Sequence, residues 1–193
     1  MRFCSLDYEF PFQLLVAVRL SAQCTDARVN LVTPALFERY KTIEDFANAD
    51  PAEVGKYIYS CGFYKSKAES IVGMAQKILA DYNGEVPDNI DDLLTLPGVG
   101  RKTANLIVGD IYGKAAIVVD THCIRITNRL GLVAEKDPKK IEFALKKIIP
   151  TQEGSDFCHR IVLFGREVCT ARNPKCDDCR LAQICKKTGV KKK

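Results

Sequence analysis

The 193-residue sequence contains no long hydrophobic run, because no uninterrupted aliphatic stretch is longer than residues 14–18. A membrane-spanning helix needs about 18 apolar residues, so this class is excluded. The N-terminus also lacks the basic region, apolar stretch and cleavage site of a secretory signal. Internal repeats and low-complexity linkers are missing as well. We therefore expect a cytoplasmic globular protein of one large or two small domains.

Composition and charge fit this class. Apolar residues make up 47% and charged residues 27% of the chain, as in soluble globular proteins. The net charge of +5 is unevenly distributed: residues 1–138 hold 15 basic and 18 acidic side chains, whereas residues 139–193 hold 14 and 6. The surplus of eight positive charges in the second segment suits a polyanion partner, although a solvated basic surface is the plainer interpretation.

The nine cysteines do not form a disulfide framework, because no export signal precedes them and their number is odd. Their spacing separates them into two groups. Five are scattered, and four fall within 17 residues in the pattern C-x6-C-x2-C-x5-C. The four clustered cysteines, which have the spacing of a metal site, are Cys169, Cys176, Cys179 and Cys185.

Helical periodicity dominates the chain, and we predict an all-α fold. Apolar residues recur on one face near residues 14–22 and again over residues 68–79. Asp50-Pro51 and Asp137-Pro138 each combine an N-cap with a proline suited to a first helical turn. They predict helices over about 51–60 and from 138. Residues 115–119 are the one β-like stretch, and a single short strand cannot build a sheet.

Residues 88–113 predict a helix-hairpin-helix. A short helix from Asp88 should stop before Pro97, and Gly98 and Gly100 permit positive φ in the turn that follows. Val99 is expected to plug into the core, and the second helix to begin near Arg101. Backbone N–H groups at such a helix start bind phosphate without regard to base sequence. An ordinary helix–helix turn is the alternative interpretation.

A lysine and an aspartate add chemistry to this hairpin. Lys102 lies in the first turn of the second helix, where the positive end of the helix dipole favours the neutral amine that forms Schiff bases. A phosphate contact is the competing role for this lysine. Asp120 follows an apolar run and suits an N-cap, a carboxylate that stabilises positive charge at a sugar C1′, or both. His122 is expected to be structural rather than catalytic.

Four cysteine thiolates can hold either zinc or a [4Fe–4S] cluster. Structural zinc sites usually pair two short Cys-x2-4-Cys knuckles, and only Cys176 and Cys179 are that close here. The wider outer spacings suit the larger cubane better, but the pattern alone leaves both open. The loop between Cys169 and Cys176 carries Arg172 and Lys175, a basic finger suited to DNA phosphate.

Three motifs in this order resemble the endonuclease III family of the helix-hairpin-helix DNA glycosylase superfamily. They are residues 96–104 (LPGVGRKTA), residues 119–122 (VDTH) and the four-cysteine pattern; residues 20–26 and 62–68 extend the likeness over almost the whole chain. The resemblance implies a bifunctional glycosylase and abasic-site lyase of base excision repair that removes oxidised pyrimidines. Lys102 would form the imine that leads to β-elimination, Asp120 would be the essential carboxylate, and a [4Fe–4S] cluster would occupy the four cysteines.

The resemblance also implies how double-stranded DNA would be held by a monomeric, nucleoid-associated enzyme. Gln23 and Phe63 align with the gap-filling and wedge positions, although leucine is more common than phenylalanine at the wedge. Gly98, Gly100 and Arg101 in the hairpin, together with the basic finger, would contact the backbone. The expected domains are residues 4–114 with the hairpin and 115–193 with the cluster, bordering a DNA cleft where Lys102 and Asp120 face each other. The resemblance also implies a further helix ahead of this segment, which we expect to be absent from this chain.

Other functions remain as alternatives. An adenine-mismatch glycosylase shares the hairpin and the cluster but resembles this chain less, because Val18 stands where that branch has a catalytic glutamate and that branch lacks the lysine found here at 102. A non-catalytic, metal-folded DNA-binding module would bind phosphate in a salt-sensitive way without cleaving DNA. A cluster-based redox sensor would lose its cleavage activity when the cluster is oxidised.

Overall fold

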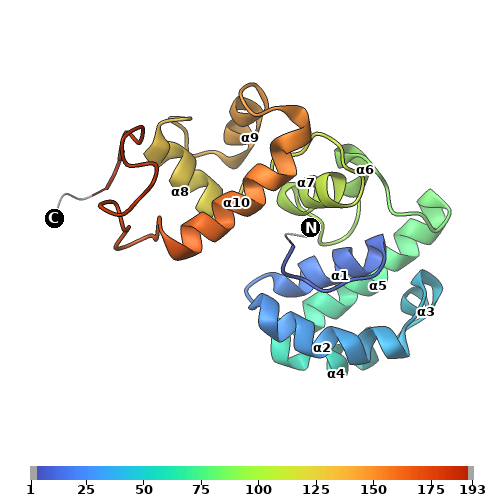
Figure 1. Cartoon of the computed structure of the whole chain (residues 1–193). Helices are drawn as coiled ribbons and strands as arrows, with labels where there is room; N and C mark the ends of the chain where they lie inside the picture. Colours follow the sequence, from blue (N-terminus) through green and yellow to red (C-terminus); the bar gives the residue numbers. More distant parts are fainter. Residues whose placement is uncertain (1–3, 191–193) are drawn as a thin grey trace. The chain divides into compact units, whose positions relative to one another are not determined.

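The computed structural model describes residues 4–190 and is built from helices, without a strand in that part of the chain (Figure 1). The all-α prediction is therefore confirmed. The chain divides into two compact units whose boundary falls between Tyr112 and Gly113. The last three residues of the expected cluster domain, all lysines, lie outside the described residues. No helix among those described is both long and apolar enough to cross a bilayer.

In the described part of the chain, the first unit consists of seven α-helices and one 3-10 turn, and its helix α1 (Pro11–Ser21) is buried among the others. It contains α1 (Pro11–Ser21), α2 (Asp26–Arg39), α3 (Ile43–Ala47), α4 (Pro51–Tyr57), the short 3-10 turn η1 (Tyr59–Cys61), α5 (Tyr64–Tyr82), α6 (Ile90–Leu93) and α7 (Arg101–Asp110). α1 packs against α2, α5 and α7. Its buried side chains lie on all sides: Phe12, Gln13, Leu14, Leu15, Val16, Ala17 and Leu20. We expected apolar residues on only one face of this helix. They occupy its whole circumference instead, as in a helix that is buried on all sides.

Two predicted helix starts are present with their caps. The Asp50 carboxylate accepts from the Ala52 amide at the start of α4, and Asp137 accepts from the Lys140 amide at the start of α9 (Pro138–Lys146). The helix expected over 51–60 is shorter, because α4 ends at Tyr57 and the chain continues into η1. A glycine with φ of +69°, Gly62, then reverses the chain before α5, as a helix-ending glycine does.

The hairpin lies between α6 and α7. Asn89, not Asp88, caps α6 by accepting from the Asp92 amide. The Val99 amide donates to the Leu96 carbonyl at 3.1 Å, and both side chains are buried, so Val99 anchors the turn as expected. Gly98 has φ of +76°, but Gly100 has φ of −100° and is the N-cap of α7. Of the two glycines that permit positive φ in this turn, only Gly98 uses it.

The second unit packs α8 (Thr121–Leu130) against α10 (Gly154–Glu167), with α9 (Pro138–Lys146) and the turn η2 (Thr151–Glu153) completing it (Figure 1). Gly165 of α10 lets the His122 side chain of α8 approach the α10 backbone closely, because a Cβ there would lie 2.2 Å from the His122 Nδ1. Residues 115–119 do not form a strand, and the Val118 amide donates to the Cys158 Sγ at 3.1 Å. The β-like sequence thus packs against the core of the second unit instead of pairing as a strand.

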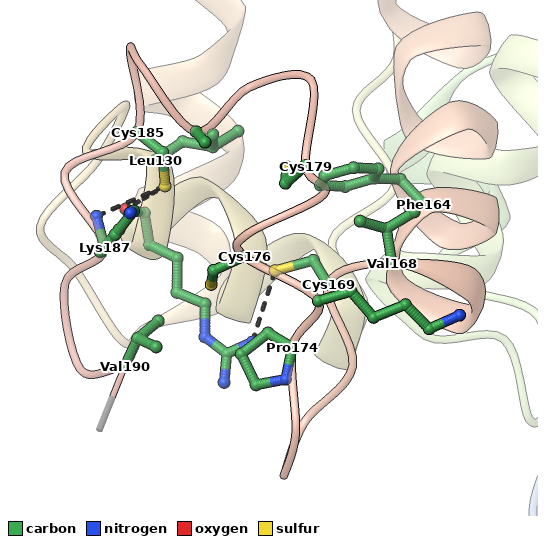
Figure 2. A pocket seen from close by; sticks show the side chains of 13 residues that line it. Leu130, Phe164, Val168, Cys169, Pro174, Cys176, Cys179, Cys185, Lys187 and Val190 are labelled. Carbon is green, nitrogen blue, oxygen red and sulfur yellow. Dashed lines mark hydrogen bonds between the residues drawn. The ribbon is translucent and has the colours of Figure 1, made fainter. Parts of the chain in front are cut away.

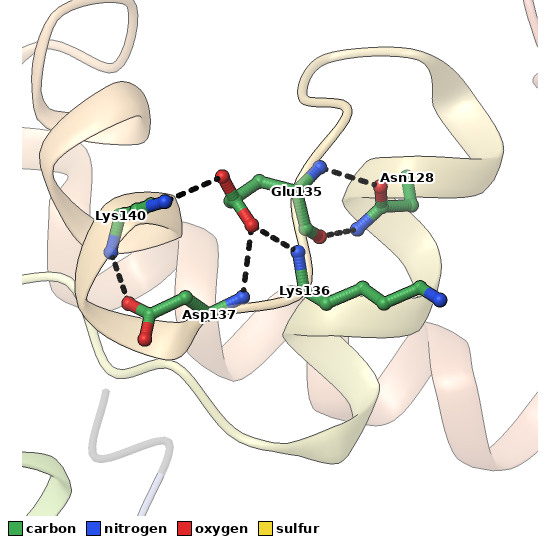
Figure 3. A network of polar contacts seen from close by, with 5 residues as sticks. All are labelled: Asn128, Glu135, Lys136, Asp137 and Lys140. Carbon is green, nitrogen blue, oxygen red and sulfur yellow. Dashed lines mark hydrogen bonds and ion pairs between the residues drawn. The ribbon is translucent and has the colours of Figure 1, made fainter.

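A network around Glu135 fixes the connection from α8 to α9 (Figure 3). The Glu135 carboxylate accepts from the Lys136 and Asp137 amides and pairs with the Lys140 ammonium at 3.6 Å. The Asn128 side chain meets the Glu135 backbone amide and carbonyl. These amide donors hold the pKa of Glu135 below its ordinary value.

Candidate functional site

Among the described residues, no side chain caps the N-terminus of α7, where the hairpin ends. Gly100 offers no side-chain cap to the first N–H groups of α7. A Cβ added to Gly100 would meet nothing within 4 Å, whereas a Cβ on Gly98 would lie 2.8 Å from the Arg19 Nε. Gly98 is therefore required by the fold, and Gly100 leaves open space before a helix N-terminus. An anion can approach the backbone there.

Lys102 is the second residue of α7 and its side chain is exposed. The neighbouring turns of the helix are fixed by burial of Ala104, Ile107 and Val108. An accessible amine therefore follows directly after the hairpin whose open N-terminus can bind a phosphate. The helix that carries this amine is held in place by its buried residues. Val18, in α1, is partly exposed and brings no carboxylate to this unit.

Asp120 is the N-cap of α8 and is half-buried. Its Oδ1 accepts from the Cys123 amide at 2.7 Å, which fixes the carboxylate at the start of the helix. The N-cap interpretation is confirmed by this bond. The same bond orients the second carboxylate oxygen, so a structural and a chemical role are compatible. His122 pairs through Nδ1 with the Arg125 guanidinium at 3.0 Å, a contact within the second unit.

Gln23 and Phe63 share an unusual backbone conformation. Their φ angles are +57° and +47°, in the left-handed region that residues other than glycine seldom adopt. Phe63 leaves 69% of its surface exposed, and Gln23 is also exposed. An apolar residue that closes a helix end in the core would be buried, so the exposure of Phe63 does not fit such a role. Strained, exposed residues of this kind are concentrated at binding sites.

The four clustered cysteines line one cavity of about 390 Å³, counted with the space that opens to solvent (Figure 2). Within residues 4–190, no three cysteine, histidine or carboxylate side chains converge closely enough to hold a single metal ion. Four thiols spread around one cavity suit a cluster of several metal atoms better than one zinc ion. The cavity walls are mainly apolar, with Leu130, Phe164 and Val168 among them.

Donors around these sulfurs also fit a thiolate-bound cluster. The Arg129 guanidinium lies 3.4 Å from the Cys169 Sγ, and the Lys187 amide lies 3.4 Å from the Cys185 Sγ. N–H groups directed at cysteine sulfur stabilise the negative charge of a bound iron–sulfur cluster. The residues present therefore fit the group.

Two arginines of α8 hold the cysteine loop, and the sequence analysis missed both. Arg129 donates to the Thr170 and Ala171 carbonyls at 2.7 and 2.8 Å, and Arg125 donates to the Cys169 carbonyl at 3.0 Å. Their spacing of four residues on one amphipathic helix was the available signal. The predicted finger residues Arg172 and Lys175 are exposed beside this support.

The fold and the cysteine site define a helix-hairpin-helix protein with an iron–sulfur domain. Residues 16–151 match the HhH-GPD superfamily base excision DNA repair protein, and residues 169–185 match the iron-sulfur binding domain of endonuclease III. The chain belongs to the endonuclease III family.

Individual relatives agree with this assignment. The chain is 50% identical to the endonuclease III of Synechocystis sp. over 183 residues, which are 94% of this chain and 84% of that protein. It also matches a solved non-covalent endonuclease III–DNA complex with a TM-score of 0.89 and 45% identity, over 95% of this chain and 86% of the other. A trapped endonuclease III–DNA covalent intermediate, in an estranged-adenine complex, gives the same TM-score and identity over 95% and 87%.

Proposed function

We propose that this chain removes oxidised pyrimidines from double-stranded DNA and cleaves the strand 3′ to the resulting abasic site. Its family membership makes it a base excision repair DNA glycosylase with abasic-site lyase activity. The single observation that carries the proposed chemistry is the exposed Lys102 amine in the first turn of α7, directly after the open hairpin. The expected site of action is the DNA of the nucleoid in the cytoplasm.

The hairpin binds the DNA backbone in this proposal. A phosphate approaches over Gly100, where an added Cβ would meet no atom within 4 Å, and accepts from the first N–H groups of α7. Arg101 adds positive charge at the same end of the helix. The exposed Arg172 and Lys175 contact phosphate from the cysteine loop.

Gln23 and Phe63 act when the damaged nucleotide leaves the helix. Extruding a base unstacks its neighbours and leaves a gap in the duplex. Phe63 is an exposed aromatic wedge, and Gln23 fills the gap with an amide that can donate and accept. Both residues lie between helices, with their backbones in the left-handed region.

Lys102 and Asp120 carry the reaction. The neutral Lys102 amine attacks the sugar C1′, and the bond to the base breaks with its electron pair leaving on the base. Asp120 stabilises the positive charge that develops at the sugar. Ring opening gives an imine between Nζ and C1′. Loss of a proton from C2′ then expels the 3′ phosphate by β-elimination, and water releases the lysine.

The four cysteines hold a [4Fe–4S] cluster, in keeping with the iron–sulfur domain match. A cluster bound to these four cysteines would crosslink the 169–185 loop. Arg129 and Arg125 fix the same loop to α8 through backbone carbonyls. The loop is thereby held rigid, and Arg172 and Lys175 meet the DNA without losing much conformational freedom.

Product analysis on defined duplexes tests this function against its alternatives. With thymine glycol as the lesion, the protein should release the base and leave a 3′ unsaturated aldehyde. Release of adenine from a mismatch without strand cleavage would favour the mismatch-glycosylase alternative. Salt-sensitive binding with neither base release nor cleavage would favour a DNA-binding module and contradict the proposal.

A further inference from the structure

One lysine of the first unit is almost completely buried and joins the ends of two helical segments. Lys67 of α5 leaves only 1% of its surface exposed. Its ammonium donates to the Leu20 carbonyl of α1 at 2.8 Å and to the Cys61 carbonyl of η1 at 2.9 Å. Leu20 and Lys67 are 47 residues apart in the sequence. The lysine therefore links two chain segments that are not held together by their connection along the chain.

Both acceptors lie at the C-terminal end of their segment, where a cation is the favoured partner. Carbonyls of the last helical turn have no partner within the helix, and they carry the negative end of its dipole. A buried ammonium in turn needs acceptors, because it has lost its contacts with water. Burial lowers the pKa of Lys67 from its ordinary value. If either carbonyl moved away, this buried group would lose an acceptor, so the contact fixes both segment ends.

The same lysine lies behind the two turns proposed to enter DNA. We call these the Gln23 turn (residues 22–25, between α1 and α2) and the Phe63 turn (residues 62–63, between η1 and α5). Each carbonyl bound by the ammonium lies within two residues of one of these turns. The backbone amide of Lys67 also donates to the Phe63 carbonyl at 3.1 Å. Lys67 is thus bonded to the Phe63 turn itself and to the segments that lead into both turns.

The two turns need such support because their backbones are strained. Gln23 has φ of +57° and Phe63 has φ of +47°, in the left-handed region that favours glycine. Residues in this conformation persist only where the surrounding structure holds them. Neither exposed side chain can provide that support by packing into the core. The buried hydrogen bonds of Lys67 lie directly behind both turns and can provide it.

We propose that Lys67 is a positioning residue for extrusion of the damaged nucleotide. Its ammonium holds the ends of α1 and η1 together, which sets the spacing of the Gln23 and Phe63 turns before DNA binds. The wedge and the gap-filling amide then enter the duplex together, without a further loss of conformational freedom in the protein. Lys67 is buried and acts only through the two turns. This inference rests on the proposed function, which supplies the roles of Gln23 and Phe63.

Lys67→Met tests the positioning role, because methionine keeps an unbranched apolar stem and removes the donors. Base release from a thymine glycol duplex should slow by about tenfold under single-turnover conditions with saturating protein, since small misplacements of positioning groups are costly. Gln76→Met is the matched control on the same helix. Gln76 donates to the Ala47 carbonyl at the end of α3 at 3.0 Å, away from both turns. This control should release base at the wild-type rate.

A double-mutant cycle separates positioning from general damage to the protein. The background is the variant with Gln23→Ala and Phe63→Ala, in which the turns carry no side chain that enters DNA. If Lys67 acts through these side chains, adding Lys67→Met to this background should change the rate of base release by less than about twofold. Damage to the fold or to the Lys102 chemistry would slow both backgrounds equally. Equal slowing in the two backgrounds would overturn the proposal.

Lys67→Gln is the second variant, and it serves if Lys67→Met does not fold. Its amide keeps N–H donors on a shorter side chain, so it should fold and should slow base release in the wild-type background only. Circular dichroism and urea unfolding check that each variant is folded. A folded Lys67 variant that releases base at the wild-type rate would overturn the positioning role. A wild-type protein that releases no base would instead contradict the proposed function, so the two failures are distinguishable.

Discussion

Gly98 lies so close to Arg19 that a Cβ on the glycine would stand 2.8 Å from the arginine Nε. The same Cβ would lie 2.9 Å from the Cβ of Ser70, and the φ of Gly98 is +76°. Gly98→Ala should therefore destabilise the protein by at least about 1–2 kcal/mol, the usual cost of a left-handed alanine. Urea unfolding measures this change; an unchanged midpoint would contradict the described turn.

Gly100→Ala is the matched variant in the same hairpin. Its φ of −100° suits any residue, and an added Cβ meets nothing within 4 Å. Stability should stay within about 0.5 kcal/mol of wild type. Affinity for duplex DNA should nevertheless fall, because the methyl group occupies the space proposed for a phosphate. Unchanged affinity in a titration at fixed salt would contradict phosphate approach over Gly100.

Phe63→Ala separates wedge function from folding. The ring is 69% exposed, so its removal should leave the free energy of unfolding nearly unchanged. Base release from a thymine glycol duplex should slow by about tenfold, equivalent to roughly 1.4 kcal/mol of lost transition-state stabilisation. Leu31→Ala is the control, since that side chain is also large, apolar and 70% exposed. Equal losses in both variants would contradict a specific wedge.

Arg129→Met tests the support of the cysteine loop. The change removes the donors to the Thr170 and Ala171 carbonyls and to the Cys169 sulfur. Loss of such outer contacts typically weakens metal affinity by about 10–100-fold. Iron content and visible absorbance after dialysis against a chelator should decline faster than in wild type. Arg160→Met, which removes only an exposed pair with Asp156, should behave like wild type.

Glu135→Gln should lower the melting temperature at neutral pH, because the amide loses the charge that two backbone N–H groups and Lys140 stabilise. The pKa of Glu135 is lowered in the folded protein, so its contribution is present above the unfolded-state pKa of about 4.3 and is lost as pH falls through the folded value. Wild-type and variant melting curves should therefore converge in acid. A constant difference across that range would contradict this assignment.

Local signals in the sequence predicted the helices and the hairpin well. Asp50, Asp137 and Asp120 each accept from a backbone amide at a helix start, which short-range capping rules can identify. Val99 is buried as the hairpin pattern required. The four cysteines line one cavity because they lie in one short segment, where spacing alone limits their separation.

Features that depend on contacts between distant segments could not be predicted in this way. The sequence allows positive φ at both Gly98 and Gly100, and only the folded hairpin shows that Gly98 is the one of the two that adopts it. No local signal in the sequence indicates that Lys67 is buried, yet its ammonium lies in the core and donates to the Leu20 and Cys61 carbonyls. The roles of Lys102, Asp120 and the DNA-contacting residues stay predictions, since they concern a bound substrate.

The most direct test of the central claim is borohydride trapping on thymine glycol DNA. Reduction of the imine should leave the wild-type protein covalently attached to DNA, and Lys102→Ala should give no adduct. Lys139→Ala is the matched control, because Lys139 is also an exposed lysine at the second position of its helix, α9. We predict full trapping by Lys139→Ala and none by Lys102→Ala. An adduct that persists in Lys102→Ala would contradict the assignment of Lys102 as the nucleophile.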